Sequence, residues 1–377
     1  MKILHYINGL SVGGAEKLLT DILPMMKQSG HEVHLLLSNH QSEAKKYYDT
    51  LQESGVQIKR LNKANLNPMQ VFHLIRILRK EQFDIVHAHI FPSQYWLALA
   101  SWFKPSQTQL IKSEHNVFNN RRKYKILKVI ERLVYSRYAL VISITAAVDA
   151  SLISWLQQVR TVVIPNGVNL KQIAEERARG MHIHYEFLKP EHYNILMVGR
   201  FSGAKDQHTL IQAMLHLPAH FHLFLAGRGA LAEVTKQFTA RLGLSGRVHF
   251  LGMRTDVYNL MNKVDLNVLS THFEGLSGVA LESLASGKPF IGSDVPGVNN
   301  VVPDSRFLFP DQQPELLAKR IAAISADPEL SSEMVKTAQA HVAKYDIPLM
   351  CEEYLKVYQS VLNEDTSSTS INEIKPE

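Results

Sequence analysis

Short runs of β-branched and apolar residues alternate with longer stretches of helical periodicity through the first half of the chain. The runs predict strands at residues 3–7, 32–37, 85–89, 110–114, 140–144 and 162–164. Helical periodicity between them includes residues 15–27 and 69–81. Strands that alternate with helices are typical of a doubly wound parallel sheet, so we expect a Rossmann-like α/β domain at residues 1–165.

The same alternation restarts in the second half of the chain. The predicted strands lie at residues 194–199, 221–226, 248–251, 266–269 and 289–292, with helices that include 207–215 and 282–286. We therefore expect a second Rossmann-like domain at residues 193–345, joined to the first by a polar, weakly periodic interdomain connection at 166–192. Two such domains facing each other across a cleft are the simplest architecture for this pattern.

The end of the sequence predicts one more helix and a tail. Asp346 suits a helix cap and Pro348 a first turn, so they predict an amphipathic helix at residues 346–362 that packs back toward the first domain. Residues 363–377 are polar, rich in Ser and Thr and carry a net charge of −3, so we expect them to form a disordered tail.

Composition excludes several classes of protein. The 377 residues are 45% apolar and 20% charged, which is ordinary for a globular protein and excludes collagen-like and mainly disordered chains. A single cysteine, Cys351, excludes a disulfide framework and a cysteine-cluster metal site. Because we find neither an apolar run near 18 residues nor a secretory signal, a cytoplasmic location is the expectation.

Charge is distributed unevenly between the two halves. Residues 1–192 carry a net charge of +10 and residues 193–377 carry −4, which favours an anionic partner for the first half. Within it, residues 121–138 predict a helix with apolar side chains on one face and basic side chains on the other; the apolar set is Ile126, Leu127, Ile130, Leu133 and Val134. Residues 121–137 either form a solvated basic face or contact an acidic membrane from its inner side. Nothing indicates nucleic-acid binding.

Two loops carry features suited to phosphate. Gly13 and Gly14 follow the first strand and precede a helix, where close backbone approach and free amides favour an anion; a tight turn is the structural alternative. Arg200 and Lys205 follow the first strand of the second half, where a diphosphate would bind in a doubly wound fold. Two solvated loop charges are the alternative there.

Two glutamates separated by seven residues carry the most specific pattern. Glu274 follows an apolar strand, and we expect Glu282 in the first turn of the next helix, beside free amides. Carboxylates in those places can accept hydrogen bonds from sugar hydroxyls, while the amides of the intervening loop hold phosphate oxygens. A favourable first-turn charge is the structural alternative for Glu282.

Histidines offer weaker signals. His115 follows a first-half strand, on the cleft side of a parallel sheet, although a lone histidine is more often structural than catalytic. His87 and His89 alternate along a strand without an obvious third ligand, so we expect no metal site. The Gly227-Arg228-Gly229 segment fits a dinucleotide pattern only loosely, and we interpret it as another cleft loop.

In order and spacing, the set resembles the retaining family 4 glycosyltransferases (glycosyl transferases group 1), which have the GT-B fold. The resemblance covers nearly the whole chain before the tail. It rests on Gly13-Gly14, His115, residues 164–168, residues 198–200 with Lys205, residues 250–252, residues 274–282 and residues 285–289.

The resemblance implies a role for each matching residue. Arg200 and Lys205 hold the donor diphosphate, Glu282 binds the nucleotide ribose, and Glu274 is a catalytic residue near the reacting carbon. His115 is a catalytic residue that approaches the transferred sugar from the first domain. The remaining donor-binding positions are the backbone at Leu276, Ser277, Gly278, Val279 and Gly14, and Gly13 lies on the acceptor side. One departure is Asp206, which follows the motif lysine where family members commonly have glycine and brings a negative charge near the expected phosphate site.

The resemblance, together with these features, implies a retaining glycosyltransferase, which we expect to need no cofactor or metal. It would move a hexose from a nucleoside-diphosphate sugar to a saccharide or lipid-linked saccharide in cell-surface polysaccharide, lipopolysaccharide or glycolipid synthesis. A nucleotide-sugar epimerase of the same fold and a non-catalytic nucleotide-sugar-binding partner of another transferase are the alternatives.

Overall fold

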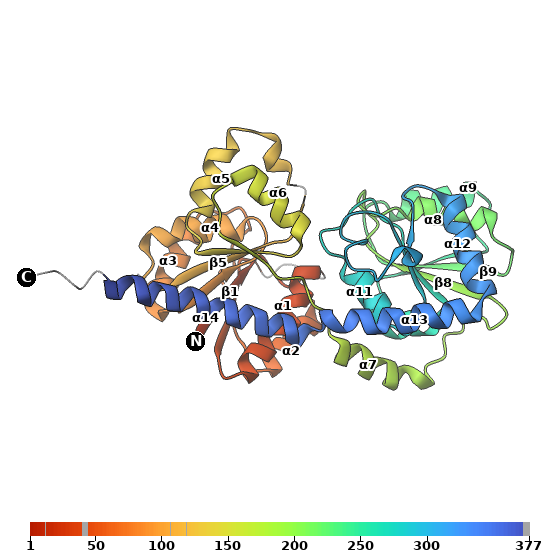
Figure 1. Ribbon diagram of the computed structural model, residues 1–377, viewed down its shortest axis with the longest axis horizontal. Coiled ribbons are helices and arrows are strands. Elements are labelled where there is room, and N and C mark those ends of the chain that lie inside the picture. Colours follow the sequence, from red (N-terminus) through yellow and green to blue (C-terminus); the bar gives the residue numbers. More distant parts are fainter. Residues whose placement is uncertain (12, 40–43, 106, 118, 372–377) are drawn as a thin grey trace, which may run out of the picture. The chain divides into compact units, whose positions relative to one another are not determined.

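The computed structural model describes residues 1–371, apart from residues 12, 40–43, 106 and 118. The chain forms two compact units (Figure 1). Unit 1 comprises Met1–Gly167 with Ile347–Glu377, and unit 2 comprises Val168–Asp346.

Unit 1 is a parallel sheet covered by helices on both faces (Figure 1). Its strand order is β3-β2-β1-β4-β5-β6-β7. The strands are β1 (Lys2–Ile7), β2 (Glu32–Leu37), β3 (Gln57–Arg60), β4 (Ile85–Ala88), β5 (Gln109–Glu114), β6 (Leu140–Ser143) and β7 (Thr161–Val163). The α-helices are α1 (Gly14–Gln28), α2 (Lys45–Glu53), α3 (Gln70–Glu81), α4 (Ser93–Ala100), α5 (Leu127–Tyr135), α6 (Ala146–Leu156) and α14 (Ile347–Ile371). Only β3, an edge strand with a single strongly apolar residue, was absent from the predicted strands of this half.

Unit 2 repeats the architecture with the strand order β10-β9-β8-β11-β12-β13, again all parallel. The strands are β8 (Tyr193–Val198), β9 (Phe221–Ala226), β10 (Val248–Gly252), β11 (Leu266–Leu269), β12 (Phe290–Ser293) and β13 (Leu308–Phe309). The α-helices are α7 (Leu170–Arg179), α8 (Gln207–Ala213), α9 (Ala232–Arg241), α10 (Val257–Lys263), α11 (Gly278–Ala285), α12 (Pro314–Ala326) and α13 (Pro328–Val342).

The segment predicted as an interdomain connection, residues 166–192, instead belongs almost entirely to unit 2. Val168 donates its amide to the carbonyl of Tyr345 at 2.8 Å, and Ile173 of α7 and Tyr185 are buried in the unit 2 core. The polar composition of the segment concealed these anchors, because a few apolar residues are enough to attach a surface helix.

The C-terminal helix also differs from its prediction. It begins at Ile347, but α14 continues to Ile371, beyond the predicted end at residue 362. The predicted tail at 363–377 is therefore helical as far as residue 371, and residues 372–377 lie outside the described part of the chain.

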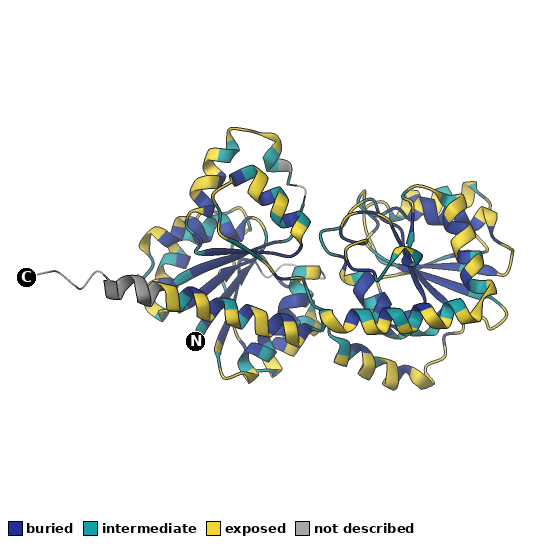
Figure 2. Ribbon diagram, in the orientation of Figure 1, coloured by how far each residue is buried: buried dark blue, intermediate teal, exposed yellow. Residues whose placement is uncertain are grey.

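Apolar side chains form separate cores on the two faces of the unit 1 sheet. One core lies under α1 and α14, and the other lies under α3, α4, α5 and α6. Figure 2 shows the strands of both units as buried, with the exposed residues on the outer sides of the helices. Such two-sided burial explains why most strands appear in the sequence as nearly continuous apolar runs.

The sheet topology determines where loops can form a site. In unit 1 the strand order reverses between β1 and β4, and in unit 2 it reverses between β8 and β11. In open parallel sheets, ligands bind outside the carboxyl ends of the strands at such switch points. Gly13 follows β1, His115 follows β5, Arg200 follows β8 and Glu274 follows β11.

Two tyrosines attach α14 to strands that lead to this edge of unit 1. The hydroxyl of Tyr358 lies 2.6 Å from His87 Nδ1, and that of Tyr354 lies 3.4 Å from Ser113 Oγ. His87 Nε2 completes the network at 2.9 Å from Ser113 Oγ. All four residues are buried, so each polar group depends on a partner within the protein.

We predict that Tyr358→Phe lowers the free energy of unfolding by about 1–3 kcal/mol, because it leaves a buried imidazole nitrogen unpaired. Urea unfolding of the full chain measures the change. Tyr124→Phe, at a residue that is 63% exposed, is the matched control and should leave the midpoint unchanged. Equal midpoints for the two variants would contradict the structural role assigned to the Tyr358 hydroxyl.

Candidate active site

Unit 2 brings two of the predicted site residues into direct contact. Lys205 Nζ donates to Glu274 Oε1 in an ion pair, with side chains 14% and 18% exposed. The backbone supports this contact, because Lys205 forms an antiparallel bridge with Thr271, just after β11. Arg200 is exposed and makes no ion pair or side-chain hydrogen bond within the described residues, so its guanidinium is available to a ligand.

The start of α11 provides backbone donors beside this ion pair. Ser277 caps the helix, its Oγ accepting from the amide of Ala280 at 3.3 Å. The amides of Gly278 and Val279 form no hydrogen bond among the described residues, as expected for the first residues of a helix. Such amides can hold phosphate oxygens.

The predicted place of Glu282 in the first turn is wrong. α11 begins at Gly278, four residues before the predicted start, so Glu282 lies in the second turn, away from the free amides. Its Oε1 accepts from the hydroxyl of Tyr258 at 3.0 Å. The prediction assigns the apolar run Val279-Ala280-Leu281 to the loop. In the structure this run is helical, because Ser277 caps the helix and α11 begins directly after it. Tyr258, on α10, is a partner that the sequence pattern did not reveal.

Gly297 is a second residue that motif reasoning missed. It has φ +83°, and a Cβ atom there would lie 2.5 Å from the carbonyl oxygen of Glu274. The same segment pairs with the Glu274 loop, because Glu274 N donates to Pro296 O at 3.2 Å and Ser277 N to Gly297 O at 2.9 Å. The turn at Gly297 therefore supports the backbone that carries Glu274.

The glycine pair of the loose dinucleotide pattern has a packing role. A Cβ at Gly227 would lie 1.9 Å from the carbonyl oxygen of Gly199, and one at Gly229 would lie 2.1 Å from that of Phe201. The amide of Phe201 donates to the carbonyl of Arg228 at 3.1 Å. The loop after β9 therefore supports the loop that carries Arg200.

Asp206 does not present its charge freely beside Lys205. The residue is buried, and its Oδ1 accepts from the amide of Thr209 at 3.1 Å as the cap of α8. His272 lies between its Oδ2 and Asp311 Oδ1, with Nδ1 at 4.0 and 3.4 Å. These three side chains are close enough to hold a metal ion. The negative charge expected near the phosphate site is thus stabilised by a helix N-terminus.

In unit 1, Gly13 caps α1 and Gly14 is its first residue. A Cβ at Gly13 would lie 2.4 Å from Glu16 Oε2, whereas one at Gly14 would meet nothing within 4 Å. Ser11 Oγ donates to Glu16 Oε1 at 2.9 Å. A carboxylate of the protein thus lies against the first glycine, and an anionic ligand at Gly13 requires this side chain to turn away.

His115 lies at a polar cavity of about 220 Å³ at the end of β5. Phe91, Glu114, Asn116 and Arg121 are among the residues that line it. Nε2 of His115 is buried without a hydrogen-bond partner among the described residues. Burial lowers the pKa of His115 to about 4, so the imidazole is neutral at physiological pH and can donate one hydrogen bond and accept another.

The sequence pattern lacked a third histidine beside His87 and His89, and the structure supplies His5 from β1. The three side chains are buried, and their nearest ring nitrogens are close enough to hold a metal ion. In this arrangement they bond to neighbours instead: His5 Nδ1 lies 3.0 Å from His89 Nε2, and His87 contacts Tyr358 and Ser113. The histidine cluster contacts the candidate site residue His115 through the ring of His89, and the two ring centroids lie 6.2 Å apart.

The predicted residues therefore divide between the units. Gly13, Gly14 and His115 belong to unit 1, and residues 200–282 of the predicted set belong to unit 2. Within unit 2, the structure brings Lys205 and Glu274 together beside the start of α11.

Two family models match the two halves of the chain. The model described as glycosyltransferase family 4 matches residues 12–172, and the one described as glycosyl transferases group 1 matches residues 183–341. The chain belongs to the family 4, group 1 glycosyltransferases. It is therefore a transferase, as the motif set predicted.

Curated relatives of this group 1 glycosyltransferase carry related names. The lipopolysaccharide core biosynthesis glycosyltransferase LpsE of Rhizobium meliloti is 25% identical over 376 residues, which cover 96% of this chain and 99% of that protein. The putative glycosyltransferase EpsF of Bacillus subtilis is 26% identical over 314 residues, with 78% and 79% covered.

Solved structures establish the GT-B fold for this glycosyltransferase. HepE of Anabaena, in complex with UDP and glucose, matches with a TM-score of 0.79 at 22% identity and covers 96% of this chain and 100% of HepE. A glycosyltransferase from Rickettsia africae matches with a TM-score of 0.81 at 18% identity, with 96% and 98% covered.

We predict that Gly297→Ala destabilises the protein and lowers transferase activity, because the methyl group meets the Glu274 carbonyl. Gly243→Ala is the control: its φ is +70°, but nothing lies within 4 Å of a Cβ there. The control should cost about 1–2 kcal/mol from backbone strain alone. Gly297→Ala should cost about 1–3 kcal/mol more from the overlap. Urea midpoints and turnover measure both effects, and equal losses in the two variants would contradict the contact.

We also predict that stability falls as the pH decreases from about 7 toward 4. Burial lowers the pKa of His5 to about 3 and that of His115 to about 4, and moves those of His87 and His89 well below their ordinary value. Below about pH 6.5 the unfolded chain binds protons that the folded chain does not, so unfolding is favoured.

Each histidine contributes a slope of up to about 1.4 kcal/mol per pH unit in that window. Urea midpoints between pH 7.5 and 4.5 measure the effect, and His115→Asn should show a shallower dependence. A midpoint that is constant over this range would contradict the neutral, buried state of the cluster.

Proposed function

We propose that this glycosyltransferase moves a hexose from a nucleoside-diphosphate sugar to a saccharide or lipid-linked saccharide acceptor, with retention of anomeric configuration. The observation that carries the proposal is the contact of Lys205 with Glu274 at the β8/β11 switch point, beside the free amides of α11. A cation, a carboxylate and helix amides are the groups that a diphosphate next to a sugar requires.

The chemistry follows from the charges that develop as the bond breaks. Cleavage at the anomeric carbon leaves negative charge on the diphosphate and positive charge on the sugar ring. Arg200, Lys205 and the amides of Gly278 and Val279 would stabilise the leaving diphosphate in place of a metal ion. Glu274 would accept from the sugar hydroxyls and face the positive ring.

Lys205 has to serve two anions in this scheme. Lys205 pairs with Glu274, so an incoming phosphate competes for the same ammonium group. We expect the donor to draw Lys205 toward the diphosphate and leave the Glu274 carboxylate for the sugar. Glu282, held by Tyr258, would bind the ribose, and the neutral His115 of unit 1 would contact the transferred sugar.

Names of the relatives support the class of donor and acceptor. HepE was solved with UDP-glucose, which favours a UDP-hexose donor. LpsE acts in lipopolysaccharide core synthesis, and a Campylobacter jejuni relative, 23% identical over 308 residues, transfers N-acetylgalactosamine to a diphospho-undecaprenol-linked saccharide. These names support our proposal that the reaction belongs to cell-surface glycoconjugate synthesis. We also propose that it takes place at the cytoplasmic side of the plasma membrane.

A panel of UDP-, GDP- and ADP-hexoses, tested with EDTA present, examines this proposal. We expect one donor to raise the thermal midpoint and to be hydrolysed slowly to the nucleoside diphosphate. Glu274→Gln and Lys205→Ala should each lower turnover by about 100-fold or more. Glu233→Gln and Lys236→Ala, which break an exposed ion pair on α9, are the matched controls and should retain full turnover.

The other outcomes separate the alternatives. Conversion of the donor to another sugar without release of nucleotide would indicate an epimerase. Donor binding without any turnover, even with lipid-linked saccharides added, would indicate a binding partner. Full activity of Glu274→Gln would remove that residue from the site.

A further inference from the structure

Helix α5 of unit 1 has an inverted distribution of side chains. Its Glu131 is 1% exposed, whereas Val129, Ile130 and Leu133 are 68%, 49% and 54% exposed. Ile126, just before the helix, is 79% exposed. Figure 2 shows α5 in the outer helix layer of unit 1 with much of its surface exposed.

This arrangement corrects the expected apolar face of residues 121–138. Of the five apolar residues predicted to share a face, only Val134 is buried and Leu127 is half-buried. The other three lie on the surface. The helical periodicity was real, but the helix presents part of its apolar face outward.

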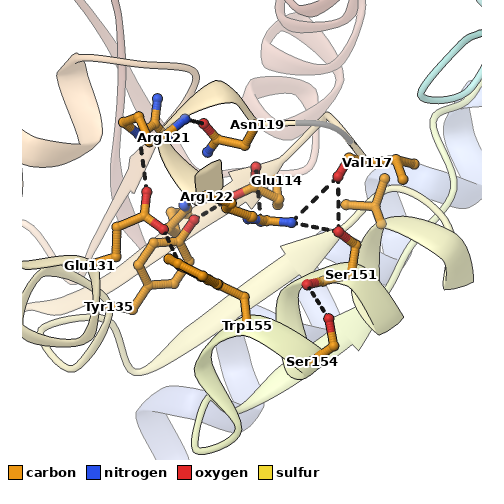
Figure 3. Close-up of polar contacts among 12 residues, drawn as sticks. Glu114, Val117, Asn119, Arg121, Arg122, Glu131, Tyr135, Ser151, Ser154 and Trp155 are labelled. Carbon is orange, nitrogen blue, oxygen red and sulfur yellow. Dashed lines mark hydrogen bonds and ion pairs between the residues drawn. The ribbon is translucent and has the colours of Figure 1, made fainter. Parts of the chain in front are cut away.

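A polar anchor holds α5 in this orientation. Glu131 accepts from the hydroxyl of Tyr95 at 2.8 Å, Arg121 Nε at 3.0 Å and Trp155 Nε1 at 2.7 Å. Figure 3 shows the side chains of Arg121 and Trp155 converging on this carboxylate. Rotating the helix to bury Ile130 would break all three contacts and leave a charge unpaired, which is strongly unfavourable. The exposed apolar face is therefore a fixed feature of the fold.

Positive charge dominates the segment that carries this apolar face. Lys123, Lys125 and Arg132 are exposed, and Glu131 is the only acidic residue between His115 and Val148. Since Glu131 is buried, this segment presents cations without a carboxylate among them. Exposed aliphatic side chains next to exposed cations are typical of a surface that meets anionic lipid.

Two aromatic side chains extend the same face. Trp102 and Phe103, in the short helix η1 (Ser101–Phe103), are 60% and 51% exposed. Arg137, just after α5, lies over the Trp102 ring at 5.1 Å and donates from Nε to Ser101 Oγ at 3.0 Å. The contact ties η1 to the end of α5. Exposed tryptophan beside arginine is common at membrane interfaces.

We propose that α5 and η1 together form a docking face for an anionic phospholipid surface. The aliphatic side chains of α5 enter the acyl boundary, Trp102 lies at the headgroup level, and the cations contact lipid phosphates. Charge favours lipid over a second copy of the chain, because a two-fold contact through this face would place the same cations opposite one another. No helix among the described residues is long and apolar enough to cross a membrane, so the contact is interfacial.

The docking face is also connected to the cavity at His115. Arg121 lines that cavity and bonds to Glu131 on the inner side of α5. Docking through α5 therefore brings the cavity close to the lipid surface, where a lipid-linked saccharide presents its sugar. This last link rests on the proposed function, whereas lipid binding by the face does not.

Co-sedimentation of the full chain with vesicles tests the proposal. We expect binding to phosphatidylcholine vesicles that contain phosphatidylglycerol, and little binding to phosphatidylcholine alone or at high salt. The variant Ile126→Ser, Val129→Ser, Ile130→Ser and Leu133→Ser keeps every charge and should bind at least about tenfold more weakly. The variant Lys123→Glu, Lys125→Glu and Arg132→Glu should lose binding as well.

Controls separate lipid contact from folding and from catalysis. Val234→Ser with Leu316→Ser removes exposed apolar side chains from unit 2 and should bind vesicles like the wild type. Donor hydrolysis in solution should be unchanged in all these variants. A failure of the proposed transferase reaction would therefore be distinguishable from a failure of vesicle binding. Brominated lipid should quench wild-type tryptophan fluorescence and should quench Trp102→Phe much less.

Three outcomes would overturn the proposal. The wild type fails to bind vesicles containing phosphatidylglycerol, the aliphatic variant binds as tightly as the wild type, or that variant changes only the oligomeric state of the protein in solution.

Discussion

Parallel strand pairing is the constraint on which the candidate site depends. All strands of a parallel sheet end at the same edge, so residues that are distant in the sequence are collected there. In unit 2, β8 and β11 are neighbours although three α-helices, a short 3-10 helix and two strands separate them along the chain. That pairing is what brings Lys205 against Glu274.

The loops at this edge keep their positions through close backbone packing. Gly297 and Gly227 have positive φ and lie so close to a neighbouring carbonyl that a side chain would overlap it. One supports the Glu274 loop and the other the Gly199 loop. The candidate site for a flexible, charged ligand is thus built on rigid backbone. Its loops lose less conformational entropy when the ligand binds.

Buried polar groups give unit 1 its particular surface. Burying the Glu131 carboxylate under α5 costs desolvation free energy, which hydrogen bonds from three donors offset. The same hydrogen bonds fix the rotation of α5 so that its aliphatic side chains point outward. Lys112 and Glu114 form another buried ion pair, beside the His115 cavity, with Lys112 Nζ 2.9 Å from Glu114 Oε2. Burial opposes ionisation of Glu114, but the charge of Lys112 and the Tyr135 hydroxyl hold its pKa at about 2. Helix α5 therefore has a buried charge on its inner side and exposed apolar groups on its outer side, the opposite of an ordinary surface helix.

Local pattern alone predicted the two α/β domains and most strand positions, because short apolar runs and glycine-containing loops have few alternative structures. It also singled out Lys205 and Glu274, which the structure brings into contact. Tertiary structure decided the rest. The start of α11 depended on the cap at Ser277. The attachment of residues 168–192 to unit 2 depended on a few buried anchors. The position of His5 beside His87 and His89 depended on the pairing of β1 with β4. The outward face of α5 depended on partners 36 residues before and 24 residues after Glu131. Periodicity records which residues share a face, but only the surrounding side chains decide which face is buried.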